Sequence, residues 1–146
     1  SGYPSRIYAG YTDKELYNTQ SIFNIILKEN AEYNIKFILG ILNSKLMNFY
    51  HSSNYLDLSK NLFQKILIQN CKKFPIPEQN NKANKIIQLV DTILNLNDLL
   101  HSASLETERQ QLQRAIDHAE KKIDQLVYEL YGLTEEEIRI VEGRNE

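Results

Sequence analysis

Residues 105–130 read LETERQQLQRAIDHAEKKIDQLVYEL, and this stretch decides the fold of the second half of the chain. Its apolar side chains recur three, four or seven residues apart, at Leu105, Leu112, Ile116, Ala119, Ile123, Leu126 and Leu130. This heptad-like spacing places them on one face of a helix, with charged residues on the other faces. We therefore predict a long amphipathic helix that packs against a second helix.

The partner helix is predicted immediately upstream, from about residue 82 to residue 100. Its apolar seam consists of Ile86, Leu89, Val90, Ile93, Leu96 and Leu100. Residues 101–104 are polar or small and allow a turn, so we expect the two helices to form an antiparallel hairpin. Gly132 is placed to end the second helix, and Thr134 with Glu137 predicts a capping box that starts a short last helix.

The first half carries shorter patterns. Residues 17–28 alternate with period two and predict a well-buried strand. Residues 34–51 have apolar side chains at helical spacing, with Asn34 as the N-cap. Residues 62–69 predict a second strand, although so short an apolar run can also be helical, and Pro75 and Pro77 end regular structure.

Together these elements predict an α+β fold class that is mostly helical overall. We expect residues 1–81 to form a small mixed strand–helix–strand recognition lobe, to which residues 3–12 could add an edge strand. Residues 82–146 are expected to form a long, coiled-coil-like antiparallel helical hairpin and a short C-terminal helix.

Charge divides the chain at the same place. The 146 residues have a net charge of −2, but residues 1–85 hold 11 Lys and Arg against 6 Asp and Glu, and residues 86–146 hold 6 against 13. This asymmetry indicates a basic working half and an acidic half that is solvated or faces a partner. The abundance of Asn, Lys and Ile is equally explained by an AT-rich genome.

Several classes of protein are excluded by what the sequence lacks. Cys71 is the single cysteine, so no internal disulfide or cysteine-rich zinc site can form, which fits a reducing cytoplasm. No apolar run approaches about 18 residues, so we expect no membrane span. We find no glycine-rich phosphate loop, no nucleophile elbow and no histidine pair at metal-ligand spacing, and we expect no catalytic residues, no metal and no cofactor in this chain. The chain starts at Ser1 rather than Met, and we expect a piece of a longer protein.

Four stretches resemble the TaqI-like C-terminal specificity domain of type IIG restriction-modification enzymes and N6-adenine DNA methyltransferases. They are LGILNSKLMNFY (39–50), KFPIPEQ (73–79), IIQLVDTILNL (86–96) and IDQLVYELYGLTEEEIRIV (123–141). The second is also similar to an element of type I specificity subunits. The resemblance implies structural roles for the residues of three motifs. They are Asn43, Ser44 and Lys45 of the helix motif, Pro75 and Pro77 of the "PIP" element, and Tyr128 and Tyr131 of the terminal signature.

The resemblance implies a target-recognition domain with a helical spacer that follows a methyltransferase core on the same polypeptide. The NPPY-type catalytic motif, the cofactor-binding glycine motif and any nuclease motif are missing from this sequence. S-adenosylmethionine, and Mg²⁺ if the parent cleaves DNA, are therefore expected for the parent enzyme alone. The implied partners are double-stranded DNA and the catalytic methyltransferase or nuclease region, and the hairpin could also pair with a second copy.

The residues suited to DNA contact gather in the first half. Lysine supplies phosphate contacts, whereas Asn and Gln can read base edges. The candidate backbone contacts are Lys14, Lys60, Lys65, Lys72 and Lys73, and the candidate base readers are Asn18, Gln20, Asn61, Gln64 and Gln69. The rival hypothesis is a helical protein–protein interaction module without DNA binding, which a salt-dependent affinity for duplex DNA would distinguish.

Overall fold

The computed structural model describes residues 6–19, 22–56 and 66–143. Within these ranges the regular structure is entirely helical. The helices are α1 (Ile35–Asn43), α2 (Lys45–Tyr55), α3 (Ile68–Cys71), α4 (Asn81–Ser102), α5 (Glu106–Tyr131) and α6 (Glu135–Val141). The prediction of a mostly helical chain is confirmed, whereas the predicted α+β class is wrong.

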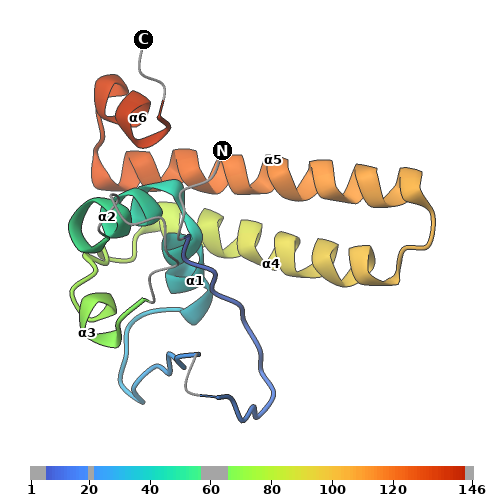
Figure 1. The fold of residues 1–146 in the computed structure, drawn as a ribbon, viewed down its shortest axis with the longest axis horizontal. Coiled ribbons are helices and arrows are strands. Elements are labelled where there is room, and N and C mark those ends of the chain that lie inside the picture. Colours follow the sequence, from blue (N-terminus) through green and yellow to red (C-terminus); the bar gives the residue numbers. More distant parts are fainter. Residues whose placement is uncertain (1–5, 20–21, 57–65, 144–146) are drawn as a thin grey trace.

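The long hairpin of α4 and α5 is the scaffold of the molecule (Figure 1). Its seam is confirmed at Ile86, Val90, Ile116 and Ile123, which are all buried. Leu105, the first residue of the predicted seam, is instead 65% exposed and precedes α5 as its N-cap. Gly132 ends α5 with a φ of 69°, a left-handed conformation that glycine adopts without strain. The predicted capping box, Thr134 with Glu137, starts α6.

The expected helix over residues 34–51 is two helices. Asn34 caps α1 as predicted, since its side chain accepts a hydrogen bond from the Lys36 backbone N–H at 2.8 Å. At Ser44 the backbone is extended, with φ −65° and ψ 154°, and the Ser44 hydroxyl accepts from the Met47 N–H to begin α2. The apolar spacing continues across this break, so the periodicity alone did not reveal it.

Neither predicted strand is found in the described residues. Residues 17–19 and 22–28 form an irregular loop rather than a buried strand, with Tyr17 92% and Ile26 85% exposed. A strand needs a neighbour for its backbone hydrogen bonds, and residues 6–12 supply none as an edge strand. Of the second predicted strand, residues 62–65 lie outside the described ranges, and the remainder leads into the one-turn helix α3.

One core joins the helices of both halves. Gly40 lies where α1 crosses α4, and a Cβ at this position would lie 2.6 Å from Cγ2 of Ile86. The core consists of Ile7, Phe37, Leu39, Ile41, Leu42, Met47, Phe74, Ala83, Ile86, Val90, Ile123 and Val127. The boundary predicted between residues 81 and 82 falls at the start of α4, but side chains from both sides pack in this same cluster. The division into lobe and hairpin stays a prediction.

None of the helices in the described ranges is both long enough and apolar enough to cross a membrane.

Candidate nucleic-acid interface

The turn after α3 presents two adjacent lysines. The Lys72 N–H donates to the Ile68 carbonyl at 3.1 Å, and the Lys73 N–H donates to that of Asn70 at 3.0 Å. Both lysines and Gln69 are exposed. The structure therefore brings these three predicted contact residues together within one turn of chain.

Residues 74 and 75 fix this turn to the rest of the molecule. Phe74 is 8% exposed, and its ring lies 6.2 Å from that of Tyr50 and 6.4 Å from that of Tyr55, measured between centroids. The Tyr131 hydroxyl on α5 donates a hydrogen bond to the Pro75 carbonyl. Because burial raises the pKa of Tyr131, this hydroxyl stays protonated and can donate. Lys72 and Lys73 thus lie on an anchored backbone, which lowers the entropy lost on meeting a phosphate.

His51 belongs to the same aromatic cluster. Its side chain is 1% exposed and its ring centroid is 6.0 Å from that of Phe74. Burial lowers the pKa of His51, so the neutral form is favoured. In the part of the chain that the structure describes, no group of three or more His, Cys, Asp or Glu could hold a metal ion. His51 is a packing residue of the anchor.

The loop between residues 10 and 33 is held at both ends. Asn43 forms a pair of 2.9 Å hydrogen bonds with the backbone of Ala9, accepting from its N–H and donating to its carbonyl. Asn48 accepts from the Ile7 N–H at 2.6 Å. At the other end the Asn34 N–H donates to the Gln79 side chain at 2.8 Å. In Figure 1 this loop and α3 extend from the side of α4 that faces away from α5.

The charge of this loop is unlike that of the lysine turn. Residues 10–32 hold two lysines against four carboxylates, and Lys14 lies between Asp13 and Glu15 in the sequence. Asn18 bonds within the loop, donating to the Ile22 carbonyl at 2.7 Å and accepting from Asn24 at 2.8 Å. The loop surroundings therefore favour phosphate contact at Lys14 less than the turn does at Lys72 and Lys73, and Asn18 supports the loop's own conformation.

The other predicted contacts cannot be placed. Lys60, Lys65, Asn61, Gln64 and Gln20 lie outside the described residues. They stay predictions from the sequence.

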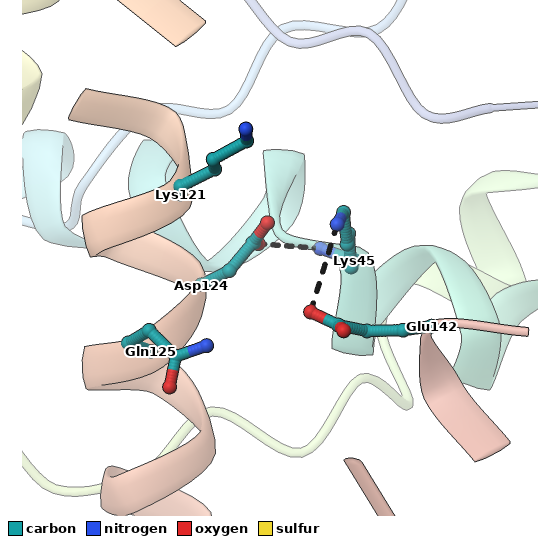
Figure 2. A pocket seen from close by; sticks show the side chains of 5 residues that line it. All are labelled: Lys45, Lys121, Asp124, Gln125 and Glu142. Carbon is teal, nitrogen blue, oxygen red and sulfur yellow. Dashed lines mark hydrogen bonds and ion pairs between the residues drawn. The ribbon is translucent and has the colours of Figure 1, made fainter. Parts of the chain in front are cut away.

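The Asn43-Ser44-Lys45 motif joins three parts of the fold. Asn43 holds the Ala9 backbone, Ser44 caps α2, and the Lys45 backbone N–H donates to Asp124 of α5 at 2.9 Å. Figure 2 shows the Asp124 carboxylate directed at the backbone nitrogen of Lys45, whereas the Lys45 ammonium group faces Glu142. The Lys45 ammonium and the Glu142 carboxylate are 3.7 Å apart.

Asp124 is the least expected member of this junction. It is only 8% exposed, and burial raises its pKa from 3.8 to about 6 despite the hydrogen bond from Lys45. It lines a pocket of about 320 Å³ together with Lys45, Lys121, Gln125 and Glu142. Sequence reasoning missed Asp124 and Asn48 because each acts on a residue more than 40 positions away. The only local signal for Asp124 is its place beside the seam residue Ile123.

The Tyr128 ring of the terminal signature is buried at 1% exposure, and Tyr131 anchors Pro75 as described. Pro77 is half-buried, and in the sequence it lies between Pro75 and the start of α4. The residues that the family motifs emphasise thus lie where the loop, the turn and the hairpin meet.

A loop and a basic turn are fixed to one end of a helical hairpin, which is the arrangement of a recognition module that carries its loops on a rigid scaffold. The chain belongs to the family of TaqI-like C-terminal specificity domains, whose model matches residues 3–76. This match covers the loop, the turn and the Asn43-Ser44-Lys45 motif.

A curated protein of Methanocaldococcus jannaschii is 30% identical to the chain over 128 residues, which is 86% of this chain and 10% of that protein. Its name gives it, provisionally, as a type II restriction enzyme and methyltransferase. The chain thus spans about a tenth of the length of this relative. No solved structure matches the chain significantly.

Proposed function

We propose that this chain supplies DNA target recognition to a restriction-modification enzyme and performs no chemistry itself. The observation that carries the proposal is the lysine turn inside the family match. Lys72 and Lys73 are exposed, adjacent and held on an anchored backbone. Lysines in such a position suit the phosphate contacts that position a protein on duplex DNA.

Base discrimination would come from the polar side chains near this turn. Gln69 is exposed on α3, one turn before Lys73, and a glutamine can form two hydrogen bonds with an adenine edge. We propose Asn61 and Gln64, together with Gln69, as further readers. Lys60 and Lys65 would extend the phosphate contacts along the same segment.

The hairpin would connect this recognition surface to a catalytic methyltransferase or nuclease region. The length and the name of the M. jannaschii relative support this arrangement. S-adenosylmethionine, and Mg²⁺ where DNA is cleaved, would bind to that region rather than to this chain, and the whole enzyme would act in the cytoplasm. A second copy of this chain is a further proposed partner.

The experiment measures binding of the chain to a duplex of arbitrary sequence at several salt concentrations. Lys72→Glu/Lys73→Glu should weaken the affinity and lower the slope of log affinity against log salt by about two, since each lost phosphate contact removes about 0.9. The control, Lys121→Glu/Arg139→Glu, makes the same change in net charge on α5 and α6, remote from the turn in sequence, and should leave the slope unchanged.

A purified chain without salt-dependent duplex affinity would contradict the proposal. It would favour the rival hypothesis, a helical protein–protein interaction module. Equal losses in both double variants would show that affinity depends on net charge rather than on the lysine turn.

A further inference from the structure

A groove runs along the hairpin between α4 and α5. Its volume is about 800 Å³, and Leu89 and Leu126 supply its apolar part. Around them the groove is lined by Lys85, Gln88, Thr92, His118, Lys121, Lys122 and Gln125, with no carboxylate among these residues. The groove is therefore a basic site on the hairpin, and two of its three lysines belong to the acidic half of the chain.

The same face continues toward the tip of the hairpin with the opposite charge. Residues seven apart lie on one face of a helix, so Lys122, Ala115 and Glu108 form one stripe on α5. All three are exposed. Along this stripe, the cation Lys122 lies in the groove, the small residue Ala115 lies in the middle and the carboxylate Glu108 lies near the tip.

The stripe on α4 ends in an apolar residue. Lys85 and Thr92 line the groove, and Leu99, seven residues further on, is 55% exposed. Leu105, three heptads before Leu126, is 65% exposed. The tip thus presents apolar side chains beside Glu108, which is the complement of a groove with an apolar centre and a basic rim.

We propose that this face binds a second copy of the chain in an antiparallel arrangement, each groove receiving the tip of the partner's hairpin. Lys122 and Glu108 lie seven residues, or about 10.5 Å along the helix, on either side of Ala115. A twofold axis near Ala115 exchanges these two positions, so each pairing occurs twice and the assembly closes as a dimer. The small side chain of Ala115 allows the two helices to approach closely at the axis.

Charge complementarity within one sequence selects this occupant. The stripe on α5 carries Lys122 at one end and Glu108 at the other, and an antiparallel copy brings these opposite charges together at both ends. This dimer rests on one part of the proposed function alone, namely that a second copy of the chain is a partner. DNA binding by the lysine turn does not depend on it.

The test is the oligomeric state of the whole chain by sedimentation equilibrium. We expect a dimer that weakens between about 0.05 and about 0.5 M NaCl, because exposed ion pairs are screened by salt. Lys122→Glu or Glu108→Lys alone should weaken dimerisation about tenfold or more, since each places like charges together twice. The double variant Lys122→Glu/Glu108→Lys should restore the affinity to within about threefold of the original.

Asp117→Lys is the matched control for the charge change at Glu108. Asp117 is exposed on α5 two positions from Ala115, which turns it about 200° away from the stripe, so this variant should dimerise normally. Circular dichroism of each variant verifies that the helices are retained.

A chain that stays monomeric at all concentrations would overturn the proposal, as would a double variant no better than the single ones. Duplex affinity is measured separately on the same samples. If the unmodified chain binds DNA but does not dimerise, this inference alone is refuted. If the unmodified chain dimerises but does not bind DNA, the recognition function alone is refuted.

Discussion

Replacing Asp124 with Asn should make the chain more stable at neutral pH and remove part of its pH dependence. The carboxylate lies between α5 and the start of α2, where it accepts a hydrogen bond from the Lys45 N–H (Figure 2). An asparagine Oδ1 can accept the same hydrogen bond. The substitution therefore removes the buried charge while it keeps the contact that joins the two helices.

The size of the effect follows from the pKa of Asp124. Burial raises this pKa from 3.8 to about 6 in the folded chain. A raised carboxyl pKa means that the folded state binds the proton more tightly than the unfolded state does. The resulting stabilisation is present below pH 3.8 and is lost as the pH rises through about 6. The difference between these two pKa values corresponds to about 3 kcal/mol in the free energy of unfolding.

Urea denaturation at a series of pH values between about 3 and 8 measures this difference. The free energy of unfolding of Asp124→Asn minus that of the original chain should rise by about 3 kcal/mol from the acidic to the neutral end, because all other carboxyl groups are common to both proteins. Asp117→Asn makes the same substitution at an exposed position on α5 and is the control for the change itself. Parallel stability curves for the original chain and Asp124→Asn would refute the reasoning.

Two further predictions concern the packing of the hairpin. Gly40→Ala should destabilise the chain by about 1–3 kcal/mol in urea denaturation, because the new methyl group would lie 2.6 Å from Cγ2 of Ile86. This loss should outweigh the higher helix propensity of alanine. A more stable variant would contradict the close crossing of α1 and α4. Ile123→Ala should cost about 2–5 kcal/mol, and Leu126→Ala less, because Ile123 is 6% exposed and Leu126 only half-buried. An unchanged thermal midpoint for Ile123→Ala would contradict the antiparallel hairpin.

The hairpin was predictable because its signals are local. The apolar residues of α4 and α5 recur at helical spacing, and Gly132 and Thr134 mark the ends through interactions within a few residues. The strand predicted over residues 17–28 failed for the converse reason. Alternating side chains form a strand only if another segment takes up the backbone hydrogen bonds, and no such partner can be read from the segment itself.

The candidate site shows the same division. The sequence placed Lys72 and Lys73 beside a rigid turn, and the structure gives that turn its anchor through Phe74 and Tyr131. The sequence did not reveal that Asp124 accepts a hydrogen bond from the Lys45 backbone N–H, because the two residues are 79 positions apart. Long-range polar contacts of this kind depend on how the helices cross, which the local pattern does not determine.

The pairing of Asn43 with Ala9 has a consequence for how this surface can change over evolutionary time. The two hydrogen bonds of the Asn43 amide are to the N–H and the carbonyl of residue 9, and both partners are backbone atoms. The two hydrogen bonds therefore require no particular side-chain chemistry at residue 9, whereas the insertion or deletion of one residue between Ile7 and Ala9 would misalign the backbone with Asn43 and Asn48. The loop that follows is thus free to diverge in sequence and in length between two fixed attachment points, as the framework beneath it stays the same.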